Sequence, residues 1–381
     1  MKFKRNFLAC TIIGLTSCAN VNTVTGVLEK IEINQPISQV EDTVFFSNAH
    51  TVVLESDKNI VIGDMARIYC SDDTLFILNS LKNEVNVVSK KGQHLRTINK
   101  QGRGHGEYVQ LVDFSYDKDS NRLLFLTAPS AVCTYTTDGA FVSKIDLSDY
   151  YSNISVDSSN IYLYHVTYIE GRKCGYTIDA IDKKTGNLSH ILPFETEYAP
   201  YCSLGNNIFS NHGHCSFVRK FDRNIYDLSQ GEIVKSYYLT PDKFTLLPEN
   251  KDVKYDCSDL LNKCLKENKI YGFSNVVYNG SNLMFSTNLW DIVIKDGLIC
   301  NRYSSIKNTE LGIPMRMFRP LEGYGDYDVC FYLQESEIES LKKIISDKQE
   351  VRNKLSRKLV TFMNEIKEPC NPILFLYKFR E

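Results

Sequence analysis

The sequence has little of what marks several large classes of protein. Its 381 residues include one Trp and 10 Pro, and 44 Lys and Arg nearly balance 46 Asp and Glu, for a formal charge of -2. The lack of a basic excess argues against a dedicated nucleic-acid-binding protein. A composition that is 43% hydrophobic and 24% charged excludes a disordered chain, a collagen-like fibre and a coiled coil. The abundant residues are instead 23 Tyr and 20 Phe, which favour β-strands.

Familiar catalytic and metal-binding motifs are also missing. The chain has no G-x-S-x-G, no H-E-x-x-H and no C-x-x-C. The glycine run at residues 102–106 lacks the G-K-[ST] ending and the following helix of a phosphate-binding loop. His212, His214 and Cys215 lie close together without a further ligand at a recognisable spacing, so an exposed loop is favoured over a zinc site. We therefore predict no cofactor and no metal site, and we name no catalytic residue.

The cysteines follow no recognisable pairing pattern. Ten of the 12 cysteines lie beyond Cys18, and they are scattered singly along the chain. An even number permits disulfides in an exported protein. Their positions inside apolar runs such as residues 132–135 favour buried small hydrophobic residues instead. The sequence leaves their disulfide state open.

The N-terminus has the features of an export signal. Residues 1–17 combine a basic head, a small-residue cleavage site and an apolar stretch too short to span a bilayer. Residues 15–18 resemble the bacterial lipobox, so we predict cleavage before Cys18 and acylation of that residue. Cys10 is a poor alternative, because almost no apolar segment precedes it. Removing residues 1–17 leaves 41 basic and 46 acidic residues, a net charge of -5. We expect residues 18–45 to serve as anchor and linker, with membrane contact through the lipid only.

A repeated hairpin is the strongest signal in the rest of the chain. Each copy is a strand, a turn with one Gly and a second strand, and the glycines of the first three copies lie 47 residues apart. The copies are residues 85–98, 132–145, 178–188, 225–234 and 292–299. A polar turn followed by an apolar strand precedes most of them, as at residues 71–78 and 119–126.

This periodicity is typical of propeller blades. We predict an all-β fold, a six-bladed β-propeller over residues 46–381, with two helical inserts. The sixth blade would combine residues 327–333 and 371–378, and residues 51–54 are candidates to complete it. A tandem array of β-sandwiches is the alternative.

Two segments interrupt the strand pattern with helical periodicity. Residues 256–269 and 336–366 place apolar residues three and four positions apart, and the second segment is expected to break near Ser346. Lys and Glu occupy the other faces of both helices. We expect amphipathic helices packed on the rim of the propeller, and a partner-binding helix is the alternative.

A seven-residue motif carries a family resemblance. Its G-x-G-x-G-E-Y pattern is formed by Gly102, Gly104, Gly106, Glu107 and Tyr108. Together with the Asn-Pro, apolar strand and Tyr-Lys at residues 371–378, it resembles the NHL-like, six-bladed β-propeller lipoproteins of Bacteroidota, most of which are uncharacterised. The resemblance implies a fold, a structural turn at the glycines and a cell-envelope location, but no substrate. Residues 19–23 lack the acidic cluster that exports some lipoproteins of this phylum to the surface, which favours a periplasm-facing protein in the outer membrane.

The predicted function is a lipid-anchored binding or scaffold module for an unknown ligand or envelope protein partner, with no role in binding nucleic acid. The alternative is a propeller hydrolase or lyase that acts on glycans or peptides. That alternative needs His or acidic side chains converging on the central channel. The weak candidates for such a channel site are His105, Asp113, His165, His212 and His214.

Overall fold

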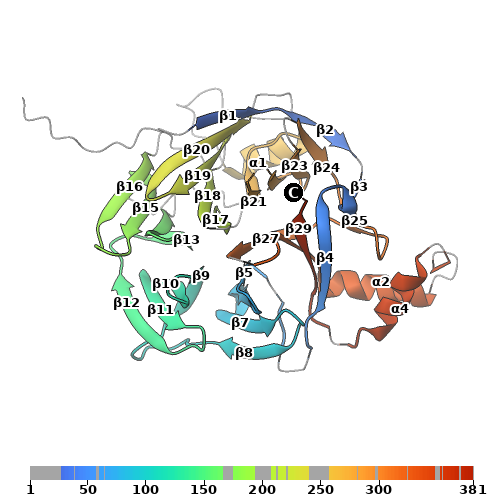
Figure 1. Ribbon diagram of the computed structural model, residues 1–381, viewed down its shortest axis with the longest axis horizontal. Coiled ribbons are helices and arrows are strands. Elements are labelled where there is room, and N and C mark those ends of the chain that lie inside the picture. The colour runs from blue at the N-terminus through green and yellow to red at the C-terminus, as the bar shows by residue number, and fades with distance from the viewer. Residues whose placement is uncertain are drawn as a thin grey trace, which may run out of the picture.

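The computed structural model describes residues 27–37, 39–56, 60–63, 65–165, 175–193, 207–211, 213–219, 222–239, 257–280, 282–296, 299–323, 325–347, 352–353, 355–368 and 370–380. The predicted signal peptide, the predicted lipidation site Cys18 and the candidate His212 lie outside these residues. Strands dominate the described residues, so the mostly-β prediction is confirmed. Most strands belong to groups of four antiparallel strands that are arranged around a common centre (Figure 1).

Six such strand groups can be followed in the described residues, and each is named here in chain order. From the inner strand outwards they are group I (β5 Arg67–Cys70, β6 Thr74–Asn79, β7 Glu84–Ser89, β8 His94–Ile98), group II (β9 Gln110–Asp117, β10 Arg122–Ala128, β11 Ala131–Thr136, β12 Phe141–Asp146), group III (β13 Tyr151–Val156, β14 Asn160–His165, β15 Tyr176–Asp182, β16 Leu188–Pro193), group IV (β17 Ile208–Asn211, β18 His214–Val218, β19 Asn224–Ser229, β20 Glu232–Leu239), group V (β21 Phe273–Asn279, β22 Asn282–Thr287, β23 Ile292–Asp296, β24 Ile299–Tyr303) and group VI (β27 Phe318–Gly323, β28 Val329–Leu333, β29 Ile373–Phe379, β4 Phe46–Val53). The five repeated hairpins of the sequence are the third and fourth strands of groups I to V.

Group VI joins the two ends of the described chain. Its outer strand β4 comes from the N-terminal part and pairs antiparallel with the C-terminal strand β29, from Val53 opposite Ile373 to Phe46 opposite Phe379. The expected pairing of residues 51–54 with the last strands is therefore present and extends further back along the chain. At the centre, the inner strand β27 also pairs in parallel with β5 of group I. It pairs in parallel with β17 of group IV at one position, where Gly323 lies opposite Asn211.

Each strand group is apolar on both faces, because it packs between two neighbours. In β6, Leu75 and Ile77 join the cluster shared with group VI, while Phe76 and Leu78 join the cluster shared with group II. This alternation follows from the period of two along a strand. Among the described residues, similar clusters lie between groups II and III, III and IV, IV and V, and V and VI. Apolar packing between successive groups therefore continues around the whole arrangement.

The segment predicted as a linker up to residue 45 is partly folded. β1 (Val27–Ile31) pairs in parallel with β20, and β2 (Ile33–Ile37) pairs in parallel with β24, so each adds a fifth strand to the outside of a group. β3 (Val40–Glu41) pairs with β25 (Ile306–Asn308), which also pairs with β26 (Ile313–Met315). A short 3-10 helix, η1 (Asp42–Val44), then leads into β4. The linker prediction was wrong for these residues because the outer strands of groups IV and V leave an edge to which they add.

Helices lie in both predicted inserts. α1 (Cys257–Lys266) falls within residues 256–269, while α2 (Glu335–Asp347) and α4 (Arg357–Glu365) fall within 336–366 apart from the first residue of α2. The Ser356 hydroxyl accepts a hydrogen bond from the Leu359 N–H at 3.0 Å and caps α4. Ile338 and Met363 are buried in the apolar cluster between groups V and VI, as expected for helices packed on the rim. Of the helices in the described residues, none combines the length and the apolar character needed to cross a bilayer.

The connections fall at two ends of the arrangement. Neighbouring strands within a group are antiparallel, so successive connections within a group alternate between the two ends. The inner strands of neighbouring groups are parallel where they pair, so this alternation has the same sense in those groups. The turns from first to second and from third to fourth strands lie at one end, here called the turn end. The other end, here called the insert end, carries the short 3-10 helix η2 (Ser80–Lys82), the connection between β8 and β9, α1, and the pair α2 and α4.

Candidate functional site

A buried arginine joins five inner strands at the centre. Arg67, on β5, donates from Nε and Nη2 to the two oxygens of Glu322 at 2.6 and 2.7 Å. Its Nη1 donates to Asp113 Oδ2 at 2.5 Å and to the carbonyl of Ile154 at 2.6 Å. Its Nη2 also donates to the carbonyl of Ile208 at 2.8 Å. All five N–H groups of the guanidinium are therefore used, on strands β9, β13, β17 and β27. These residues are called the Arg67 network.

Both carboxylates of the Arg67 network also receive backbone hydrogen bonds. The N–H of Ile154 donates to Asp113 Oδ2 at 2.9 Å, and the N–H of Ser210 donates to Glu322 Oε2 at 2.7 Å. Arg67, Asp113 and Glu322 are each 1% exposed. Burial by itself lowers the pKa of Arg67, but the charges of Asp113 and Glu322 outweigh it and hold that pKa well above its usual value. Burial outweighs the charge of Arg67 at both acids and raises the pKa of Asp113 and of Glu322. The network thus places one cation between two buried carboxyl groups, joins five inner strands and leaves no donor of Arg67 for a ligand.

A second charged cluster lies on group III. The Asp179 carboxylate, on β15, accepts from the Tyr151 hydroxyl at 2.6 Å, from His190 Nδ1 at 2.6 Å and from His165 Nε2 at 3.1 Å. These four residues, called the Asp179 cluster, come one from each strand of the group. Strand register explains the arrangement, because Asp179 lies directly opposite His190 and Tyr151 directly opposite His165. The side chain of His190 is 47% exposed, whereas that of Asp179 is 4% exposed.

The charge of Asp179 determines which ring nitrogens carry protons. Burial raises the pKa of Asp179, but hydrogen bonds from His165, Tyr151 and His190 outweigh it and hold the pKa below its usual value. An ionised carboxylate is an acceptor only, so His165 Nε2 and His190 Nδ1 must both be protonated. In neutral His190 the remaining Nε2 is then a base on a half-exposed ring that stacks on Tyr176 at 4.7 Å between centroids.

The G-x-G-x-G-E-Y motif forms a tight connection between β8 and β9. The Glu107 carboxylate accepts from the Gly104 N–H at 2.7 Å, and the Tyr108 hydroxyl donates to the carbonyl of Asn83 at 2.7 Å. Gly106 has φ +73°, and a Cβ there would lie 2.7 Å from the ring of Phe141. Only glycine meets both conditions without strain. These contacts support the interpretation of the motif as a structural turn. Burial raises the pKa of Tyr108 to about 12.

The channel candidates from the sequence are dispersed over the molecule. Asp113 reaches the centre, but it is paired with Arg67. His105 lies exposed at the insert end, with its ring edge-on to Phe141 at 4.9 Å. His165 belongs to the Asp179 cluster, and His214 is exposed at the start of β18 with its ring 6.2 Å from that of Tyr278. Among the described candidates, no two are hydrogen-bonded to each other.

Several residues that matter most were not found from the sequence. Arg67 and Glu322 come from strands at opposite ends of the chain, whereas Asp179 and His190 come from the neighbouring strands β15 and β16. One signal was available: Arg67 and Glu322, like Asp113, are charged residues next to or within apolar strand-like runs. Such a residue is costly to bury unless it is paired, so it points to a partner, although the sequence does not say which one.

A family comparison covers nearly all of the described chain. Residues 27–378 match the family described as a domain of unknown function, DUF4934. The chain belongs to this family. The match begins at the first residue of β1, so the DUF4934 domain includes the N-terminal strands that were expected to be linker. No curated protein has significant sequence similarity to the chain.

Solved structures resemble this DUF4934 protein to different degrees. A Bacteroides fragilis protein assigned as exported has 17% identity and a TM-score of 0.72, over 93% of this chain and 100% of the other. BamB from Moraxella catarrhalis has 10% identity and a TM-score of 0.40 over 68% of each chain. The Pan2 WD40 domain of Neurospora crassa has 10% identity and a TM-score of 0.39, over 83% of this chain and 77% of the other. TM-scores below 0.5 do not establish a shared fold, so the fold assignment depends on the first similarity.

Proposed function

We propose that this DUF4934 protein is a six-bladed β-propeller lipoprotein of the cell envelope that acts as a binding or scaffold module. The observation that carries the proposal is the Arg67 network, because a centre occupied by buried side chains that hydrogen-bond to one another leaves the outer surfaces for recognition. A rigid ring with long connections at one end is a suitable platform for a ligand or protein partner.

The blade assignment is supported by the six strand groups. Each has four strands, its hydrophobic faces pack on two neighbours, and five of the six inner strands meet at Arg67. An isolated four-stranded sheet of this kind exposes two apolar faces, so a closed ring is the arrangement that covers all of them. Antiparallel pairing of β4 with β29 would close this ring.

The envelope location is supported by the sequence of residues 1–18 and by the similarity to the exported Bacteroides fragilis protein. We propose that Cys18 carries the lipid, with the chain in the outer membrane facing the periplasm. In cells that process lipoproteins, wild type and Cys10→Ala should partition with membranes, and Cys18→Ala should become soluble. Membrane retention of Cys18→Ala would overturn the anchor, and loss of retention in Cys10→Ala would show that the assigned cysteine is wrong.

The insert end is the surface that we assign to the partner. It presents Trp290, which is 76% exposed in the turn between β22 and β23, and Leu265 of α1, which is 45% exposed. Tryptophan is enriched among the residues that carry most of the binding energy at protein interfaces. A photoreactive amino acid at position 290 should cross-link the anchored protein to a partner in intact cells, and the same group at Asp119 of the turn end should not. Adducts from position 119 alone would contradict the assignment.

A hydrolase or lyase acting on glycans or peptides is the second candidate, and the Asp179 cluster favours it. His190 has a carboxylate on one ring nitrogen and a half-exposed ring, which is the arrangement of a general base oriented by an acid. Turnover of a glycan or peptide substrate that disappears in both His190→Ala and Asp179→Asn would support this role. Turnover that survives in both variants would exclude the cluster as the catalytic site.

A further inference from the structure

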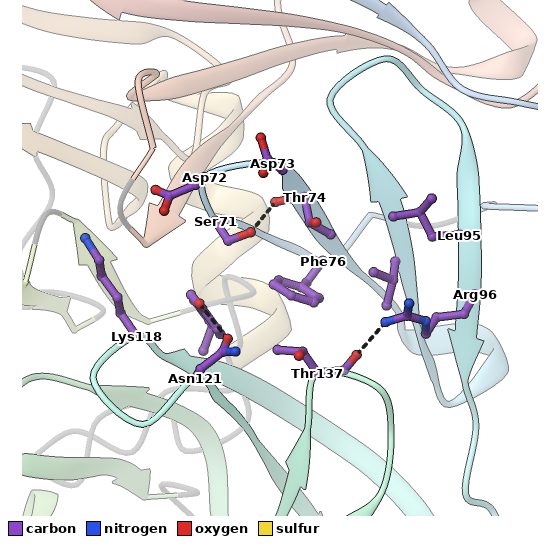
Figure 2. A pocket seen from close by; sticks show the side chains of 12 residues that line it. Ser71, Asp72, Asp73, Thr74, Phe76, Leu95, Arg96, Lys118, Asn121 and Thr137 are labelled. Carbon is purple, nitrogen blue, oxygen red and sulfur yellow. Dashed lines mark hydrogen bonds between the residues drawn. The ribbon is translucent and has the colours of Figure 1, made fainter.

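The interface between strand groups I and II holds a groove of about 430 Å³ with charges of both signs (Figure 2). Asp72 and Asp73 line one part of it, and Lys118 and Arg96 line others. Its apolar floor offers little accessible area, since Phe76 is 2% exposed. Offsetting charges and a closed floor give this groove no preference for a ligand. The interface between groups IV and V differs, because it contains a buried carboxyl group that is not fully paired.

This carboxyl group belongs to Asp227, on the face of β19 that packs against group V. Asp227 lies two residues from Ile225, which belongs to the apolar cluster between groups IV and V, so both side chains point the same way. Asp227 is 5% exposed, and among the described residues its Oδ1 has no hydrogen-bond partner. Burial raises the pKa of Asp227 to about 6, although the charges of His214 and Lys235 lower it. The carboxyl group is therefore neutral in mild acid and ionised at neutral pH.

Lys235, on β20, has two carboxyl groups beside it. It lies directly opposite Asp227 in the strand register, a position from which side chains of neighbouring strands meet. Its ammonium group nevertheless pairs with Glu29 of β1 at 2.9 Å and lies over the ring of Tyr237, 4.3 Å from the centroid. In the part of the chain that the structure describes, no ion pair joins Lys235 to Asp227. Lys235 thus holds a carboxylate of the N-terminal strand while a second carboxyl group lies beside it on its own group.

Glu29 joins the N-terminal strand β1 to two strand groups. Besides Lys235 of group IV, it pairs with Lys295 of group V at 3.0 Å. Burial raises the pKa of Glu29, but hydrogen bonds from the two lysines outweigh it and hold the pKa below its usual value. Glu29 therefore stays ionised over the pH range in which Asp227 titrates. These two ion pairs supplement the packing of Ile31, which is buried in the cluster between groups IV and V.

The other titratable groups beside Asp227 come from β18, β20 and β21. His214, at the start of β18, is exposed, and its ring lies 6.2 Å from that of Tyr278 on β21. Burial and a hydrogen bond with Tyr278 raise the pKa of Tyr237, so this phenol stays neutral here. Loss of the Asp227 charge in acid and protonation of His214 both make the surroundings of Glu29 more positive. The two changes therefore act in the same direction.

We propose that Lys235 is a pH-sensitive latch for the N-terminal strand β1. When Asp227 is neutral, Lys235 is left to Glu29, and β1 is held to group IV. When Asp227 is ionised, it competes with Glu29 for the same ammonium group, and β1 opens more readily. The latch therefore favours the closed strand in mild acid. It does not depend on the function proposed above.

Hydrogen exchange of the backbone N–H groups of β1 tests the latch. Exchange in the purified chain is measured at about pH 5 and about pH 7.5, and each rate is divided by the intrinsic rate at that pH to give an opening constant. An ion pair of this exposure changes an equilibrium by up to about fivefold, so we expect the opening constant of β1 to be about two- to fivefold larger at the higher pH. Equal opening constants at the two pH values, or a larger one in acid, would overturn the proposal.

Two variants assign the effect to its residues. Asp227→Asn keeps the shape of the side chain and removes its titration, so β1 should open at both pH values as little as it does in the wild type in acid. Lys235→Met removes the shared cation, so β1 should open at both pH values at least as readily as it does in the wild type at about pH 7.5. Unfolding by urea checks that both variants are folded. A full pH effect on β1 in either variant would refute the latch.

Two further variants are the controls. Glu232→Gln removes an exposed acid from the same strand, β20, and it should leave the pH effect unchanged. His214→Gln removes the neighbouring imidazole, and β1 should still open more readily at the higher pH. A pH effect that disappears in His214→Gln would assign the titration to His214 and overturn the role of Asp227.

Discussion

The Arg67 network and the Asp179 cluster are both built around charged side chains, but they differ in how much of the fold they hold together. Arg67 bonds to residues of four other inner strands, belonging to four other strand groups, with every donor used and all three charged groups 1% exposed. Among the residues that the structure describes, the partners of Asp179 all belong to its own group, and one of them, His190, is half exposed. The first is therefore expected to stabilise the arrangement of the strand groups as a whole. The second is local, and water reaches part of it.

The largest effect is expected when the Arg67 network loses its cation. Arg67→Met leaves Asp113 and Glu322 buried without a counter-charge, so the free energy of unfolding should fall by about 3–5 kcal/mol. Arg96→Met is the matched control, since Arg96 forms an exposed pair with Asp138, and it should lower the free energy of unfolding by no more than about 1 kcal/mol. Urea unfolding followed by circular dichroism measures both.

A triple variant separates loss of charge pairing from loss of packing. Arg67→Met combined with Asp113→Asn and Glu322→Gln has no buried charge at the centre, so part of the lost stability should return. If Arg67→Met were no more destabilising than Arg96→Met, the central network would not be structural.

A smaller effect is expected from Asp179→Asn. The amide cannot accept equally well from the three donors of Tyr151, His165 and His190, so we expect a loss of about 1–3 kcal/mol in the free energy of unfolding at pH 7. A loss larger than that of Arg67→Met would reverse the comparison between the two regions.

The pH dependence of that loss has a definite sign. Asp179 has a lowered pKa in the folded protein, so its contribution to stability is fully present above the unfolded value of about 3.9. It disappears as the pH falls through the lower, folded pKa. The difference in unfolding free energy between wild type and Asp179→Asn should therefore be constant just above pH 4 and shrink below it. A difference that grew on acidification would contradict this linkage.

The smallest effect is expected from His190→Gln. Its ring is half exposed and makes one hydrogen bond to Asp179, so the free energy of unfolding should fall by less than about 1.5 kcal/mol. His105→Gln, at an exposed histidine of the insert end, is the control and should be nearly neutral. If His190→Gln cost as much as Asp179→Asn, the cluster would depend on His190 rather than on the carboxylate.

The repeating parts of the fold could be predicted from the sequence, because their signals are local. Gly92 and Gly139 mark hairpin turns with positive φ, and each lies between two strand-like segments of a repeat that recurs after 47 residues. No glycine hairpin turn adjoins the inner strand β5, so the repeat does not reveal it. The strand β1 was missed because its pairing partner β20 lies some 200 residues further along the chain.

The Arg67 network could not be predicted for a different reason. The contact between Asp179 and His190, by contrast, is local, since the two residues lie opposite each other on neighbouring strands. Arg67 meets Glu322 only after the chain has gone round all six strand groups, and no local spacing encodes that contact. The nomination of Asp113 identified one member of the network, and that of His165 identified one member of the Asp179 cluster. Their partners follow from the three-dimensional arrangement.

Hydrogen exchange at the centre tests most directly the claim that the Arg67 network locks the inner strands together. The N–H groups of Ile154 and Ser210 donate to Asp113 and Glu322. We predict that both exchange only through global unfolding, with a free energy of opening equal to the free energy of unfolding measured in urea. Exchange of these two N–H groups through local opening, while strands further from the centre such as β29 stay protected, would contradict the account.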